Sequence, residues 1–175
     1  MRLRGKRILL FAGPDYEDME LQYPRYRLME EGALVTIVGI GEVVYHGKKG
    51  YPVTVDAQAT DVRASDFDAA VIPGGWAPDK LRRVPEVLDL VRELNDAGKP
   101  IAFICHAGWV PISAGILKGR RCTSVGAIRD DMINAGVDWV DEPCVVDGNL
   151  ITARTPDDLP VWLPAMIDAI ASASS

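Results

Sequence analysis

The chain has 175 residues and a mass of 19.0 kDa, which predicts a single domain, residues 1–175, that buries its own hydrophobic core. Its 48% hydrophobic and 25% charged residues are typical of a soluble globular protein, so we expect disorder only in the Ser-Ala tail, residues 172–175. The formal net charge of −6 disfavours a nucleic-acid partner, because an acidic chain repels phosphate.

Apolar runs of strand length alternate with helical patterns along the chain. In chain order we predict a strand over residues 7–12, a helix over 16–31, strands over 34–39 and 69–73, a helix over 85–97, a strand over 101–105 and a helix over 109–118. Gly32, Gly98 and Gly119 follow the three helices as stop signals. This alternation indicates an α/β fold with a doubly wound, mostly parallel sheet flanked by helices.

Two segments interrupt the alternation. Residues 42–55, with a turn at 47–50, and residues 144–153, with a turn at Asp147-Gly148, predict antiparallel additions to the main sheet. Thr155, followed by Pro156 and two acids, predicts a capped final helix that ends near residue 170. We find no internal repeat and no linker that would indicate a second domain.

Signals for nucleic acid, membrane or metal are weak in this sequence. The densest basic segment, residues 118–121, is short, and we interpret it as a solvated helix end. The apolar run at residues 8–12 is too short for a signal peptide, and no run approaches the length of a membrane span. The two histidines and three cysteines lack zinc-ligand spacing. We therefore expect a cytoplasmic protein with no metal, no cofactor, and no membrane or nucleic-acid partner.

Cys105 occupies the point where a buried strand is expected to turn into a helix. It follows the apolar run 101–104 and precedes His106, Ala107 and Gly108. This is the pattern of a nucleophile elbow with cysteine in place of serine. The neighbouring helix N-terminus would stabilise the thiolate and lower the pKa of Cys105. We expect Cys122 and Cys144, by contrast, to be inert small apolar residues.

The residues alone leave the base for this thiol open. Class I glutamine amidotransferases complete such an elbow with a histidine near the C-terminus, but no histidine follows His106, which excludes that triad. The remaining candidates are His106, His46 and a carboxylate. We interpret His46 as an exposed residue beside the hairpin turn.

Six segments together resemble the PfpI branch of the ThiJ/PfpI superfamily over nearly the whole chain. They occur in family order and at family spacing, and they read YEDMELQYP at 16–24, PGGWAP at 73–78, ICH at 104–106, ISAGILKG at 112–119, RDDMINAGVDWV at 129–140 and VDGN at 146–149. The resemblance implies a flavodoxin-like, class I glutamine amidotransferase-like fold with Cys105 as the nucleophile.

The resemblance also implies which groups surround the nucleophile. Glu20 is the implied buried carboxyl that hydrogen-bonds Cys105 and relays a proton, with its pKa raised by burial. Gly74 and Gly75 lie where the backbone can approach a ligand closely, and the amides of Gly75 and His106 form the implied oxyanion hole.

Two positions depart from the family pattern. In relatives, the histidine that follows the cysteine, here His106, is oriented by an acid from a neighbouring subunit. That acid is typically a glutamate, and Asp79 stands at its position. Val125 stands where relatives often carry an aromatic residue in the pocket. An acid at Asp79 that reaches the histidine of a neighbouring subunit implies a homo-oligomer, a dimer or a hexamer, with sites at subunit interfaces. We also expect Trp76 to be exposed nearby, where a second subunit would cover it.

The function implied is that of a cofactor-independent cysteine enzyme for small reactive carbonyls. Its type would be a glyoxalase III or deglycase, converting methylglyoxal to lactate. One alternative is a PfpI-type intracellular cysteine peptidase acting on peptides, and a hydratase of the isocyanide type is another. A non-enzymatic redox sensor or holdase-type stress protein also fits, because a reactive thiol serves either role.

Overall fold

The computed structural model describes residues 1–174, and Ser175, the last residue of the expected tail, lies outside the described residues. The strands are β1 (Arg7–Phe11), β2 (Leu34–Gly39), β3 (Val44–His46), β4 (Pro52–Thr54), β5 (Ala57–Gln58), β6 (Ala69–Ile72), β7 (Ile101–Ile104), β8 (Arg121–Cys122), β9 (Asp138–Trp139), β10 (Cys144–Asp147) and β11 (Leu150–Ala153). The α-helices are α1 (Asp18–Glu30), α2 (Ala77–Leu81), α3 (Pro85–Asp96), α4 (Trp109–Ala114), α5 (Arg129–Asn134) and α6 (Leu159–Ser172).

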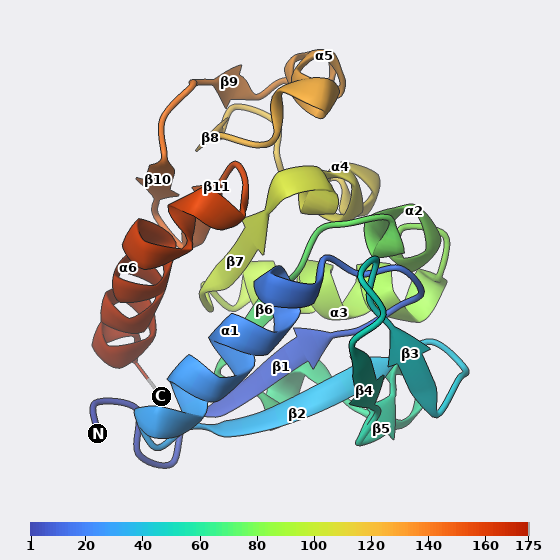
Figure 1. The fold of residues 1–175 in the computed structure, drawn as a ribbon. Coiled ribbons are helices and arrows are strands. Elements are labelled where there is room, and N and C mark those ends of the chain that lie inside the picture. The colour runs from blue at the N-terminus through green and yellow to red at the C-terminus, as the bar shows by residue number, and fades with distance from the viewer. Residues whose placement is uncertain (175) are drawn as a thin grey trace.

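A seven-stranded sheet forms the centre of the molecule, in the order β10-β11-β7-β6-β1-β2-β5. Every pairing in it is parallel except that of the edge strand β10 with β11. Helices α1 and α6 pack side by side on one face, and α3 lies on the other with α2 and α4 (Figure 1). This confirms the predicted α/β class and mostly parallel sheet.

The central strands form because their side chains are buried on both faces. All residues of β6, β7 and β11 are buried, as are residues 8–11 of β1. Helix α3 buries one face only, with Val87, Leu90, Val91 and Leu94 at three- and four-residue spacing. A parallel sheet of this kind gathers the carboxyl ends of β1, β6 and β7 at one edge, where ligands bind in such folds.

Three sequence predictions about elements need correction. The hairpin β3–β4 is a separate two-stranded sheet, because β5 takes the edge position beside β2. Strand β11 pairs in parallel with β7, so only β10 is an antiparallel addition. Helix α4 ends at Ala114 rather than at residue 118, since Gly115 adopts φ 76° and caps it.

The end of the chain also differs from the prediction. A 3₁₀ turn, Pro156–Asp158, precedes α6, and the Thr155 side chain makes no capping hydrogen bond. Helix α6 continues to Ser172, so the first residue of the expected tail is helical.

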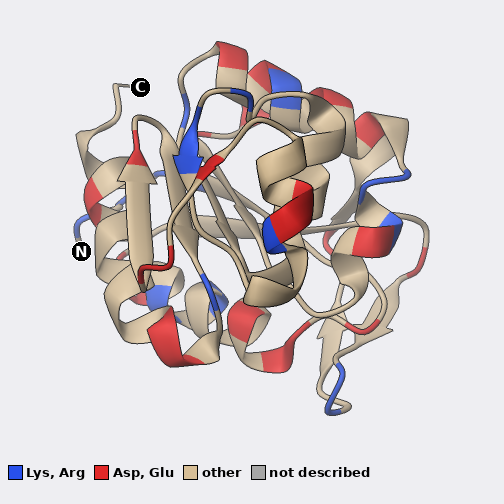
Figure 2. Ribbon diagram, turned by 90° about the horizontal axis from the view of Figure 1, so that it is seen from above, with Lys and Arg blue, Asp and Glu red and all other residues tan. Residues whose placement is uncertain are grey.

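Charged residues are mixed over the surface. Figure 2 shows Lys and Arg interspersed with Asp and Glu on helices and loops alike. The basic segment 118–121 lies in a turn and in β8 rather than at a helix end, and two of its arginines pair with acids, Arg120 with Asp147 and Arg121 with Asp138. Within residues 1–174, no helix is both long and apolar enough to span a bilayer.

Candidate active site

The turn after β7 holds Cys105 in a strained backbone conformation. Cys105 has φ 63°, a left-handed value that costs an L-residue with a Cβ roughly 1–2 kcal/mol. A 3₁₀ turn, Cys105–Gly108, then leads into α4. The strand, the strained residue and the helix confirm the predicted elbow geometry. Only 9% of Cys105 is exposed, so the thiol lies at the bottom of the site.

Two backbone amides face the sulfur of Cys105. They belong to His106 and Gly75, and both lower the pKa of the thiol by hydrogen bonding to it. Gly75 has φ 77°, and a Cβ there would lie 2.4 Å from the backbone nitrogen of Glu17. Only glycine therefore fits, and this close approach holds its amide beside the thiol. The predicted pair of oxyanion donors is thus adjacent to the predicted nucleophile.

Gly74 contacts Glu20, whereas Gly75 contacts the sulfur of Cys105. Its amide donates a hydrogen bond of 2.9 Å to Oε1 of Glu20. A Cβ at Gly74 would lie 2.5 Å from this oxygen and 2.7 Å from the Cβ of Cys105. Gly74 therefore packs closely against both residues and holds the carboxyl of Glu20. The side chains of Glu20 and Cys105 are themselves hydrogen-bonded to each other.

Glu20 is a fully buried acid in the first turn of α1. The N-cap residue Glu17 accepts a hydrogen bond from the Glu20 amide at 2.8 Å, which fixes the start of the helix. Oxygen Oε2 of Glu20 is buried and has no hydrogen-bond partner in the described part of the chain. Burial, and next the charge of Glu17, raise the pKa of Glu20 to about 8. The carboxyl is therefore mostly protonated at neutral pH, in the direction expected from the sequence.

The pKa of Cys105 runs against the expectation of a depressed value. Burial, and next the charge of Glu20, raise the pKa of Cys105 to about 12, and the amides of His106 and Gly75 offset only part of this. The sequence does not show how deeply the elbow is buried. Because a proton on Glu20 removes the charge that raises the pKa of Cys105, the thiolate forms more readily while Glu20 is neutral. At neutral pH both groups are mostly protonated, and their titrations depend on each other.

His106 lies between two tryptophans beside the thiol. Its Nδ1 is 3.3 Å from Sγ of Cys105, and its ring centroid is 5.1 Å from that of Trp76 and 5.2 Å from that of Trp109. Burial, and next the charge of Lys48, lower the pKa of His106, which favours the neutral imidazole. His46, the other histidine, is exposed at the end of β3, as expected.

Asp79 does not reach His106 within the chain. It lies in α2, and its carboxylate pairs with Arg83 at 3.0 Å and with Lys80 at 3.5 Å. Asp79 also lines a cavity of about 420 Å³ whose other walls include Trp76 and Trp109, the two rings that flank His106. The residue therefore faces the mouth of the site without touching the histidine.

The neighbours of the elbow include one residue that the sequence does not mark. Lys48, at the tip of the β3–β4 hairpin, has its Nζ 5.5 Å from the ring centroid of Trp76. The glycines around it signal a turn, but nothing in the sequence says that the turn folds over the site. Val125, noted for its departure from the family pattern, donates its amide to the carbonyl of Cys105 at 3.3 Å.

The other two cysteines are set apart from this site. Cys122 is fully buried and Cys144 is half-buried, and burial is the main cause that raises their pKa values to about 12 and about 11. Both are therefore mostly un-ionised thiols at neutral pH, and their expected inertness stays a prediction. Among the described residues, no group of three or more His, Cys, Asp or Glu is placed to hold a metal ion.

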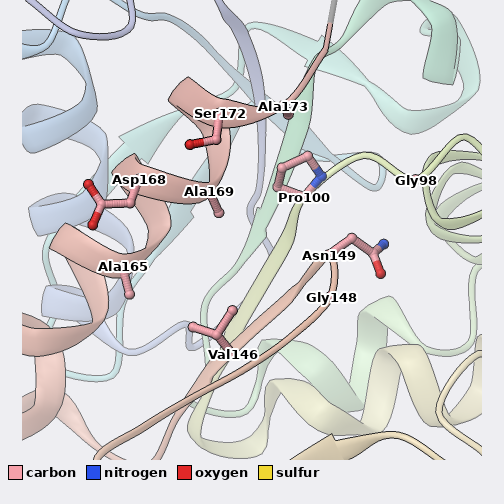
Figure 3. Close-up of a pocket in the computed structure, with 10 residues that line it drawn as sticks. All are labelled: Gly98, Pro100, Val146, Gly148, Asn149, Ala165, Asp168, Ala169, Ser172 and Ala173. Carbon is pink, nitrogen blue, oxygen red and sulfur yellow. The ribbon is translucent and has the colours of Figure 1, made fainter.

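A larger cavity lies at the opposite edge of the sheet. It measures about 510 Å³ and includes Pro100 and Asn149, next to the starts of β7 and β11, together with Asp168 of α6 (Figure 3). Cys105 follows the other end of β7, so this cavity is separate from the Cys105 thiol.

Comparisons with known proteins identify the family of this chain. The chain is 47% identical to "Deglycase PfpI" of Pyrococcus furiosus over 157 residues, 90% of this chain and 95% of the relative. It is 37% identical to "Protein/nucleic acid deglycase 2" of Escherichia coli over 161 residues, 90% of this chain and 94% of the relative. The crystal structure of Drosophila melanogaster DJ-1beta superposes with a TM-score of 0.89 at 29% identity, covering 97% of this chain and 92% of that one. The sequence profile of the DJ-1/PfpI family matches residues 6–169, and the chain belongs to this family.

Proposed function

We propose that this protein is a cofactor-independent cysteine enzyme of the deglycase or glyoxalase III type, acting on small reactive carbonyls. The observation that carries the proposal is the pairing of Cys105, at a strained elbow, with the buried, mostly protonated Glu20. The names of its relatives, several of them deglycases, support the same reaction class.

Methylglyoxal serves to describe the proposed reaction. The Cys105 sulfur adds to the aldehyde carbon, forming a C–S bond while the carbonyl π electrons move to oxygen, and this alkoxide takes a proton to give a hemithioacetal. A base removes the hydrogen from that carbon as a proton, and a proton is returned to the neighbouring carbon through an enediol, which yields a thioester of lactate. Water then cleaves the thioester, releasing lactate and restoring the thiol. The net change is addition of one water to methylglyoxal.

Each residue of the site has a proposed role in these steps. The amides of Gly75 and His106 stabilise the oxyanion that forms on addition. As the thiol adds, its proton passes to the neutral imidazole of His106, and Glu20 gives its own proton to the alkoxide. As a carboxylate, Glu20 then moves the proton between the two carbons. His106, neutral and 3.3 Å from the sulfur, is the second group able to carry that proton.

The test is turnover of methylglyoxal followed by proton NMR in D₂O. We expect lactate that carries deuterium at C2, because a proton held by Glu20 exchanges with solvent. Cys105→Ala should abolish turnover, and Glu20→Gln should lower kcat by at least tenfold while the protein stays folded. A wild-type protein that produces no lactate from methylglyoxal or from its thiol adducts would refute the proposal.

A cysteine peptidase is the second candidate, favoured by the contact between His106 Nδ1 and the Cys105 sulfur. The same thiolate would attack a peptide carbonyl to give a thioester and release an amine, which His106 would protonate. We propose that Asp79 of a neighbouring subunit orients His106 for this step, since Asp79 faces the site mouth without contacting His106 in its own chain. Asp79→Ala should then lower hydrolysis of peptide substrates more than turnover of methylglyoxal.

This arrangement requires self-association. Trp76 is 52% exposed next to Asp79, which supports a contact between subunits at this face. Analytical ultracentrifugation at micromolar concentration should give a mass of at least twice 19.0 kDa. A fully active species with the mass of one chain would show that Asp79 has no role in a neighbouring site.

A further inference from the structure

The tip of the β3–β4 hairpin is fixed to the start of α1, close to the site. The amide of Lys48 donates to the carbonyl of Tyr16 at 2.9 Å. The carboxylate of Asp18 accepts from the amides of Lys49 at 2.8 Å and Tyr51 at 3.0 Å. A Cβ at Gly47 would lie 2.4 Å from Cγ of Asp18, so the contact is close-packed. These hydrogen bonds fix the backbone of the hairpin tip, and with it the position of Lys48 beside the site.

The ammonium group of Lys48 has an aromatic partner and no acidic one. Its Nζ lies 5.5 Å from the ring centroid of Trp76, and no carboxylate comes within salt-bridge distance of it in the part of the chain that the structure describes. Two acids of the adjoining turn are engaged elsewhere, Glu17 as the cap of α1 and Asp18 with the hairpin amides. Lys48 is therefore an exposed cation that forms no ion pair within the described residues.

This cation stands close to the reacting groups. The ring of Trp76 that it covers is 5.1 Å from that of His106, whose Nδ1 is 3.3 Å from the sulfur of Cys105. Its charge acts on all three titrating groups of the site: it adds to burial in lowering the pKa of His106, and it opposes the larger effect of burial on Glu20 and Cys105. The acids near this space are Glu17 and the mostly protonated Glu20, together with Asp15 and Asp79, which line the cavity beside Trp76. Asp79 is paired with Arg83 and Lys80.

We infer that Lys48, backed by the ring of Trp76, is an anion subsite at the mouth of the active site, which selects substrates that carry a carboxylate near the carbonyl attacked by Cys105. The inference rests on the proposed function and names its substrate class: carbonyl adducts of amino acids and thiols that retain a carboxylate. A carboxylate near Nζ would gain a charge-assisted contact that a neutral adduct lacks.

Alkylation of Cys105 by two reagents of similar size tests this subsite without turnover. Iodoacetate carries a carboxylate where iodoacetamide carries a neutral amide, and both react with the same thiolate. The ratio of their rate constants at Cys105 is therefore independent of the pKa of the thiol, which Lys48 itself affects. Peptide mapping separates Cys105 from the other cysteines.

We expect Lys48→Met to lower the iodoacetate-to-iodoacetamide ratio roughly three- to tenfold, the effect of one nearby charge in a solvent-exposed position. Lys48→Arg should retain the wild-type ratio. Lys49→Met, which removes the neighbouring exposed lysine, is the matched control and should also retain it. High salt should lower the ratio in the wild type and leave that of Lys48→Met unchanged.

An equal ratio in the wild type and Lys48→Met, or an equal loss in Lys49→Met, would overturn the inference. Circular dichroism of each variant verifies the fold. The proposed function is judged separately by wild-type turnover of methylglyoxal, so a protein without turnover whose alkylation ratio depends on Lys48 would refute the function and leave the subsite standing.

Discussion

Burial of Glu20 should make the stability of the protein fall as the pH rises. The pKa of Glu20 is about 8 in the folded protein, against an ordinary value of 4.5. Between these values the folded state holds a proton that the unfolded state has lost, so the free energy of unfolding decreases with pH. Each tenfold difference in proton affinity is worth about 1.36 kcal/mol, so the full loss between pH 4.5 and pH 8 is about 5 kcal/mol.

Urea denaturation at fixed protein concentration and half-unit steps from pH 5 to pH 9 measures this effect. Glu20→Gln keeps the shape of the protonated acid but cannot ionise, so the stability of the wild type relative to this variant should decrease steadily up to about pH 8 and then level off. Glu30→Gln, at an exposed acid of the same helix, is the control and should follow the wild type. Parallel curves for the wild type and Glu20→Gln would show that the carboxyl is not held protonated, and the proton relay would lose its physical basis.

Three further predictions concern packing, reactivity and assembly. Gly74→Ala should destabilise the fold by about 1–3 kcal/mol in urea titrations, because its Cβ would lie 2.5 Å from the buried carboxyl oxygen, whereas Gly126→Ala, in open space, should cost far less. Iodoacetamide should modify Cys105 before Cys122 in peptide maps at pH 8, since two amides face the first sulfur and the second is fully buried; equal rates would show that these amides do not favour reaction at Cys105. Trp76→Asp should shift sedimentation towards the monomer by placing a charge in a buried contact, and an unchanged mass would remove this face from the interface.

The fold class could be predicted from local pattern because the central strands are buried on both faces. A strand such as β7 must then read as a continuous apolar run, and the helices between such strands must each carry one apolar face. The short elements α2, α5, β8 and β9 have no such periodicity, since each spans six residues or fewer and is held by its neighbours. The sequence also did not show which strands pair: β11 is parallel to its partner β7, and the paired residues, such as Leu150 and Ile101, lie 49 positions apart.

The position of the proposed nucleophile was determined by the sequence, and its chemical state was decided by the tertiary structure. A cysteine between a buried strand and a helix requires the elbow at Cys105, because the backbone must reverse there within a few residues. The pKa of that thiol depends instead on groups brought from other elements: Glu20 from α1, the Gly75 amide after β6 and Lys48 from the hairpin. Desolvation and charge act through space over a few ångströms, so the expected low pKa was wrong while the location was right. Local sequence specifies backbone geometry, and only the folded chain specifies the electric field at a buried sulfur.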